Sequence, residues 1–188
     1  MKSLQGFSLI ELAVVLAIIA ILAAVLTPLV TQYVDEARIT SATSDVNLIA
    51  GAMDLHKRDT GRYPVYATVT SIATDADVLF GPGAGVAFNP SWGNPTSVLM
   101  QTRLNTNFFG LPTTYGTGRI AYHGAYTQPI DTDPWGNTYV AEMGPAPGTT
   151  NAAFVVSAGP NGTVETTKLQ SQTGVLNVGG DDIVSRVK

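Results

Sequence analysis

The chain has 188 residues, a formal net charge of −4, 13% charged residues and no cysteine. This length suffices for one ordinary domain beside a membrane helix, and the lack of cysteine excludes disulfides and thiol chemistry. Lys and Arg are not clustered as they would be to bind a phosphate backbone, so we expect no nucleic-acid partner.

An apolar run over residues 12–30 dominates the N-terminal region. At about 1.5 Å rise per residue, a helix of this length spans roughly 29 Å, close to the hydrocarbon thickness of a bilayer. Apolar residues fill all of its faces, which argues against an amphipathic surface helix. The run exceeds the apolar core of a signal peptide, about 7–15 residues, and no Ala-x-Ala cleavage site follows it, so we predict that it is retained.

Charges flank this run unevenly, with Lys2 before it and Asp35 and Glu36 after it. The basic flank of a membrane helix usually stays in the cytoplasm. The sequence therefore predicts a single-pass membrane protein whose C-terminal domain lies outside the cytoplasm.

Glu11 is the only charged residue between Phe7 and Val34. A carboxylate costs roughly 2.5–3.5 kcal/mol at the centre of a bilayer and less near its interface. Two interpretations stay open. Glu11 lies at the membrane surface, where it costs little, or it pairs with a buried positive group in an assembled state.

The segment around Glu11 reads Gly6-Phe7-Ser8-Leu9-Ile10-Glu11-Leu12 and follows a short basic leader. It resembles the N-terminal motif of type IV pilins and of the pseudopilins of type II secretion, and Pro28 falls where many of these proteins carry a helix proline. The resemblance implies that a prepilin peptidase cleaves between Gly6 and Phe7 and methylates the new amine. It also implies that Glu11 recognises the Phe7 amine of a neighbouring subunit, because each group relieves the burial cost of the other.

Beyond the apolar run, residues 31–58 keep a helical period with one apolar face, formed by Ala42, Val46, Ile49, Ala50 and Met53. We therefore predict one long helix from about Phe7 to Arg58. Gly61 can take a left-handed conformation at its end and Pro64 prevents its resumption. The predicted organisation is a leader at 1–6, a membrane-spanning and filament-core helix at 7–30, its amphipathic half at 31–60 and an extracytoplasmic domain at 61–188.

Residues 65–130 are rich in Gly, Pro, Thr and Asn, and we predict mostly loops there, with a short helix near residues 97–104. From residue 119 onward the signals favour strands. Ile120, Tyr122 and Tyr126 alternate, and residues 138–142, 153–157 and 163–166 are short and β-prone. Tight turns between them indicate an antiparallel meander. The predicted fold class is α+β, with the long helix packed on a small antiparallel sheet in a pilin-like arrangement.

A second motif reads Asp133-Pro134-Trp135-Gly136-Asn137. It is similar to a signature of the major pseudopilins of type II secretion. Its residues suit a turn, because Pro134 presets φ, Gly136 permits an unusual backbone angle and Trp135 can anchor the loop. We interpret the motif as structural, without a chemical role.

A third, looser resemblance concerns the calcium loop near the C-terminus of major pseudopilins. Its two halves are similar to residues 157–162 and 180–183, with Asp181, Asp182 and Asn161 as the implied calcium ligands. Calcium takes six to eight oxygen ligands. Asn161 stands where the family usually has Asp, and residues 163–179 make a longer gap than usual. The alternative is a solvated acidic tail without a metal.

We expect no enzymatic activity, because the two histidines, His56 and His123, have no metal-site spacing and no Gly-x-Ser-x-Gly is present. The resemblance implies a helical homopolymer, with the peptidase, an inner-membrane assembly platform and minor pilins or pseudopilins as partners. We expect a type II secretion pseudopilus subunit. A type IV pilin of a surface pilus and a monomeric membrane-anchored binding protein remain the alternatives.

Overall fold

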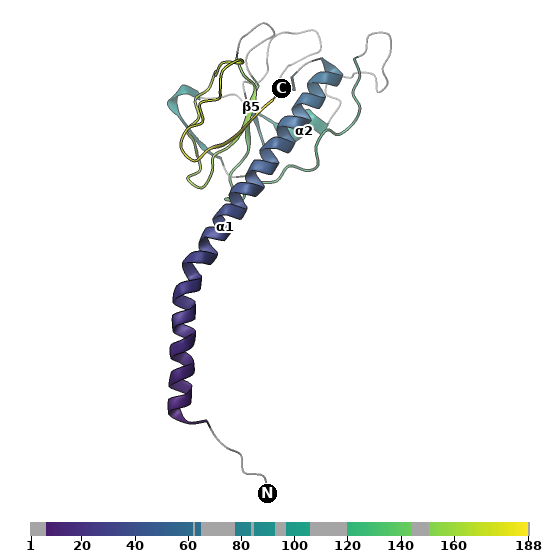
Figure 1. Ribbon diagram of the computed structural model, residues 1–188. Helices are drawn as coiled ribbons and strands as arrows, with labels where there is room; N and C mark the ends of the chain where they lie inside the picture. The colour runs from purple at the N-terminus through teal and green to yellow at the C-terminus, as the bar shows by residue number, and fades with distance from the viewer. Residues whose placement is uncertain are drawn as a thin grey trace. The chain divides into compact units, whose positions relative to one another are not determined.

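A computed structural model describes residues 7–61, 63–64, 78–83, 85–92, 97–105, 120–143 and 151–187. The leader at 1–6, with the predicted cleavage residue Gly6, lies outside the described residues. The chain divides into two units, residues 1–38 and 39–188. One long helix, α1 (Leu9–Thr60), contributes to both of them (Figure 1).

The bounds of α1 confirm the predicted helix to within two residues at each end. The helix continues through Pro28, where the Thr27 and Thr31 hydroxyls donate to the carbonyls of Ala23 and Thr27 at 2.7 and 3.1 Å. The first unit is apolar and exposed, and α1 is long and apolar enough to cross a membrane.

At its C-terminal end α1 stops at Gly61, whose φ is +72° and whose amide donates to the Lys57 carbonyl at 2.8 Å. A side chain at this left-handed position is strained. We expect Gly61→Ala to lower the free energy of unfolding by about 1 kcal/mol, and Gly61→Asn to cost less because asparagine tolerates this conformation. Thermal unfolding of the full chain in detergent measures both. An alanine variant as stable as the parent would contradict the strain.

The second unit contains a five-stranded sheet in the order β3-β1-β4-β5-β7. Its strands are β1 (Val78–Phe80), β3 (Ser97–Leu99), β4 (Val140–Glu142), β5 (Phe154–Ser157) and β7 (Ile183–Arg186). β1 and β3 pair in parallel, and the other pairs are antiparallel. A separate parallel pair joins β2 (Ala87–Phe88) to β6 (Thr163–Val164), and two short helices complete the elements, η1 (Pro90–Trp92) and α2 (Met100–Asn105).

Both faces of the sheet are covered. Ala141 and Val155 point toward the second half of α1 and share a core with Val46, Ile49 and Met53. Their strand neighbours Val140, Phe154 and Val156 belong to a second core with Trp92 and Val164. Successive side chains of a strand point to opposite faces, so a strand buried on both sides reads as a continuous apolar run. The α+β class and the packing of the helix on the sheet are therefore confirmed.

Two predictions and one alternative for the second unit need correction. Residues 120–126 are not a strand: the Ala121 amide donates to the Asp59 carbonyl at 3.0 Å, and the Tyr126 ring lies edge-on to His56, so this segment packs on the end of α1. The predicted strand at 163–166 pairs with β2 outside the main sheet, so the strands do not form one meander. The C-terminal tail is not solvated, because β7 pairs with β5.

The helix predicted near 97–104 is found in part, since β3 precedes α2 there. The strands β1, β2, β3 and β7 were not predicted. They are two to four residues long, and strands this short depend on their partners in the sheet more than on their own sequence.

Candidate functional site

The N-terminus of α1 carries the residues that the pilin motif singles out. Ser8 stands just before the helix, and its hydroxyl accepts a hydrogen bond from the Ile10 amide at 3.4 Å. The Glu11 carboxylate reaches back to the Ser8 amide at 3.0 Å. These two contacts resemble a capping box: Glu11, the third helical residue, satisfies the amide of the cap residue Ser8, and the Ser8 hydroxyl satisfies the amide of the second helical residue, Ile10. The Ser-x-x-Glu spacing signals this role in the sequence, and our sequence analysis missed it.

The apolar residues after Glu11 have no cover within the described part of the chain. Phe7 is 89% exposed, and the most apolar stretch of α1 has none of its residues buried. Exposed apolar surface of this extent marks a membrane-spanning or protein-binding segment. The segment thus requires lipid or other apolar helices around it.

The motif at 133–137 forms a turn built on one buried carboxylate. Asp133 is 2% exposed, and its side chain accepts hydrogen bonds from the amides of Trp135 and Asn137 at 3.1 and 2.7 Å. The Ser157 hydroxyl donates to the same carboxylate at 2.8 Å. Gly136 has a φ of +89°, which the turn requires. Asn137 then donates to the Gly159 carbonyl at 3.0 Å and so ties this turn to the loop that follows β5.

The structure brings the two halves of the proposed calcium loop together. The Asn161 amide donates to the Asp181 carboxylate at 3.1 Å, and the Asp182 carboxylate accepts from the amides of Glu165 and Thr166 at 2.9 and 2.5 Å. A Cβ atom at Gly159 would lie 2.5 Å from the Asp181 carbonyl oxygen, so only glycine permits this approach.

Two buried oxygens in this loop cluster have no hydrogen-bond partner, namely Oδ1 of Asp181 and Oδ1 of Asp182. Asp182 is 7% exposed, and burial raises the pKa of its carboxyl above the ordinary value. Buried acceptors are normally satisfied, so these two atoms are open to a positively charged ligand. Within the described ranges, however, no group of three or more His, Asp or Glu residues is arranged to hold a metal ion.

Asn161 and Glu165 also belong to the cluster. The Asn161 side chain accepts from the Thr163 amide at 2.6 Å and donates to the Glu165 carboxylate at 3.2 Å. The Glu165 carboxylate lies against Gly180, where a Cβ would overlap it. Sequence analysis missed Glu165, because only the fold of the 163–179 segment returns it to Gly180.

The histidines have structural surroundings at the end of α1. His56 is buried, and its Nδ1 lies 3.2 Å from the Thr60 hydroxyl. His123 Nδ1 lies 3.2 Å from the Asp59 carboxylate, which is itself buried in the same helix turn. Both histidines thus serve to hold residues 120–126 against α1.

A family model described as the prokaryotic N-terminal methylation motif matches residues 1–27. The chain is 29% identical over 158 residues to the type II secretion system core protein G of Pseudomonas aeruginosa. The aligned region covers 84% of each of the two chains. It is 26% identical over 162 residues to the protein of the same name from Escherichia coli, with 86% of each chain covered. The corresponding Klebsiella pneumoniae protein is 24% identical over 165 residues, 88% of this chain and 91% of its own. No solved structure matches the chain.

The methylation motif, the long apolar helix and its packing on a small sheet occur here in the order that the N-terminal resemblance implies. The relatives extend the likeness from the helix through most of the globular unit. The chain is therefore similar to type IV pilin-like proteins in its N-terminal motif and to type II secretion system core protein G over most of its length.

Proposed function

We propose that this chain is a structural subunit of a type II secretion pseudopilus, a pilin-like filament that serves protein export. One observation carries the proposal. The methylation motif over residues 1–27 includes the start of an apolar helix, and no described residue of the chain buries the most apolar stretch of that helix. The relatives named core protein G, matched over 84–91% of their lengths, assign the filament to type II secretion.

The precursor is held in the inner membrane by residues 7–30, with residues 61–188 outside the cytoplasm. Prepilin peptidase cuts between Gly6 and Phe7 and methylates the Phe7 amine. An assembly platform then transfers subunits from lipid into the filament, where minor pseudopilins join them. Apolar helices that leave the bilayer bury one another, so the exposed surface of α1 stays out of water throughout.

Glu11 has two tasks in this proposal. Its carboxylate caps α1 through the Ser8 amide, and a carboxylate offers about four acceptor positions, so the cap leaves room for the Phe7 amine of a neighbouring subunit. The pair neutralises two charges that would each be costly among apolar helices.

Intact-mass and N-terminal analysis of the protein purified from its own membranes tests this function. We expect a chain that starts at methylated Phe7. A chain that starts at Met1 in cells with an active peptidase would overturn the proposal and favour a monomeric membrane-anchored binding protein. A methylated chain found only in surface pili, in cells whose secretion is unaffected by its deletion, would assign it instead to a type IV pilus.

We further propose that the loop cluster at 157–162 and 180–183 binds calcium. The support is the pair of unpartnered buried carboxylate oxygens on Asp181 and Asp182, which suits a hard cation that prefers oxygen ligands. These two side chains would hold the ion together with nearby backbone carbonyls. The Asn161 amide oxygen is engaged by the Thr163 amide, so we assign Asn161 the weakest part. Bound calcium would add stability to the loop and no chemistry.

Replacing Asp182 with asparagine tests this site. One asparagine oxygen can still accept from the amides of Glu165 and Thr166, so the variant keeps its fold and removes one buried charge. We expect calcium, compared with chelator, to raise the unfolding midpoint of the parent chain and to leave that of Asp182→Asn unchanged. Asp35→Asn, in the first unit, is the matched control and keeps the calcium response. Equal midpoints of the parent chain with and without calcium would contradict the site.

A further inference from the structure

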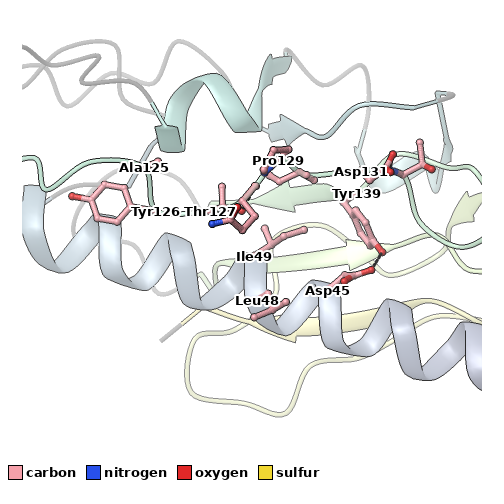
Figure 2. A pocket seen from close by; sticks show the side chains of 12 residues that line it. Asp45, Leu48, Ile49, Ala125, Tyr126, Thr127, Pro129, Asp131 and Tyr139 are labelled. Carbon is pink, nitrogen blue, oxygen red and sulfur yellow. Dashed lines mark hydrogen bonds between the residues drawn. The ribbon is translucent and has the colours of Figure 1, made fainter.

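A groove of about 420 Å³ lies on the second unit between α1 and residues 125–132 (Figure 2). Leu48 and Ile49 of α1 line it together with Tyr126, Pro129 and Ile130. Leu48 is 68% exposed although it stands beside the buried core residue Ile49. An apolar groove that the described part of the chain leaves open is a surface that a partner can cover.

The groove carries negative charge. Asp45 is held at its wall by the Tyr139 hydroxyl, which donates to the carboxylate at 2.9 Å, as Figure 2 shows. Asp131 lines the groove at the same end, near Tyr139, with its carboxylate accepting from the Thr132 amide at 2.8 Å. None of the described lining residues is basic. An apolar occupant with a nearby positive charge therefore fits this groove better than an acidic one.

The same chain carries a matching projection in the loop at residues 171–178, which does not line the groove. Val175 in this loop is 98% exposed. A single exposed apolar residue is ordinary, but this loop is held firmly. Arg186 donates to the carbonyls of Ser171, Gln172 and Gly174, and the Gln170 side chain bonds the backbone of Asn177.

The hydrogen bonds of Arg186 bring charge as well as rigidity. Its acceptors are carbonyl oxygens, which carry no formal charge, so this loop holds a cation at the carbonyl of Gly174, the residue before Val175. A loop that is already ordered loses little entropy when it binds. The loop thus offers an exposed apolar side chain one residue away from a bound cation, while the groove offers apolar walls and two carboxylates near Tyr139.

We propose that the 171–178 loop of one subunit inserts Val175 into the groove of the next copy of this chain. This inference rests on the proposed filament function and names one of its contacts between globular units. Projection and groove lie at different places on the chain, so the contact is heterologous. Contacts of this kind repeat from copy to copy and build helical filaments when the rotation does not close.

Cysteine crosslinking tests the contact directly, because the chain has no cysteine of its own. The full chain carrying Leu48→Cys and Val175→Cys is produced in cells with the secretion machinery and treated with a short bismaleimide. We expect a ladder of crosslinked oligomers, and only monomers from either single variant. Thr43→Cys with Val175→Cys is the matched control, because Thr43 is exposed on α1 but does not line the groove.

The outcomes separate this inference from the proposed function. Two results would overturn the contact and leave the proposed function standing. In the first, filaments form but the Leu48→Cys, Val175→Cys chain gives no crosslinked oligomers. In the second, the Thr43→Cys, Val175→Cys control gives as many crosslinked oligomers as that chain does. Leu48→Cys crosslinked to another protein in place of Val175→Cys would overturn the contact too. A cysteine-free parent chain that never forms filaments would overturn the proposed function and this contact together.

Charge substitutions at Val175 give a second test that does not depend on a linker. Val175 is almost wholly exposed, so neither variant disturbs the fold. Val175→Glu brings a carboxylate into the groove that already holds Asp45 and Asp131 and should reduce the yield of filaments several-fold, whereas Val175→Lys should keep more of it. Equal yields, or a stronger defect in the lysine variant, would contradict the acidic groove as the docking site.

Discussion

Replacing Glu11 with glutamine should leave the chain in the membrane and prevent its assembly into filaments. Glutamine fits the third position of a capping box, so it keeps the contact with the Ser8 amide and hence the start of α1. It removes only the charge. Breaking a buried ion pair by deleting one partner costs roughly 3–5 kcal/mol, which is about a hundredfold or more in an association equilibrium.

The measurement is the amount of filament released by shearing, set against the amount of processed subunit in the membrane. Ser8→Ala is the matched control, since it removes the hydroxyl that accepts from the Ile10 amide and costs helix stability about 1 kcal/mol while the charge of Glu11 stays. We expect Ser8→Ala to assemble nearly normally. If Glu11→Gln assembled as well as the parent, the role of Glu11 would be capping alone.

The second large effect concerns Asp133. Alanine at this position would leave the amides of Trp135 and Asn137 and the Ser157 hydroxyl without their shared acceptor. Each hydrogen bond to a charged group contributes roughly 1.5–3 kcal/mol, so we expect a total loss of roughly 3 kcal/mol or more. For a chain of this size, that loss lowers the midpoint of thermal unfolding by roughly 6–12 °C.

Two controls make this prediction specific. Asp133→Asn keeps the size and one acceptor oxygen, so it should cost less than alanine. Asp131→Ala removes an exposed neighbour whose one described hydrogen bond goes to the Thr132 amide, so it should shift the midpoint little. Thermal unfolding of the full chain in detergent gives all three values. Equal midpoints for Asp133→Ala and Asp131→Ala would show that the turn does not depend on the buried carboxylate.

Features that depend on neighbouring residues were predictable from the sequence. The bounds of α1 follow from continuous hydrophobicity over residues 12–30, an apolar face over residues 31–58 and Gly61 at its end. The turn at 133–137 also follows from local chemistry, because Asp133 bonds the amides two and four residues ahead. In both cases most of the determining contacts lie within one or two turns of chain, where propensity and periodicity act.

Features that depend on distant partners were not predictable. The alternation of Ile120, Tyr122 and Tyr126 is the same whether the apolar side packs on a sheet or on the end of a helix. Here the segment packs on the end of α1, where it contacts His56 and Asp59. The short strands β1, β3 and β7 exist because other strands supply their hydrogen bonds.

The sequence by itself thus determined the membrane helix and its N-terminal motif, because each is encoded in consecutive residues. The tertiary structure alone decided that Asp181 and Asp182 meet the 159–166 loop and that Glu165 lies against Gly180. It alone opened the groove beside Leu48 and left Val175 exposed. These arrangements join residues far apart in the chain, and their energy comes from packing and desolvation that no local pattern records.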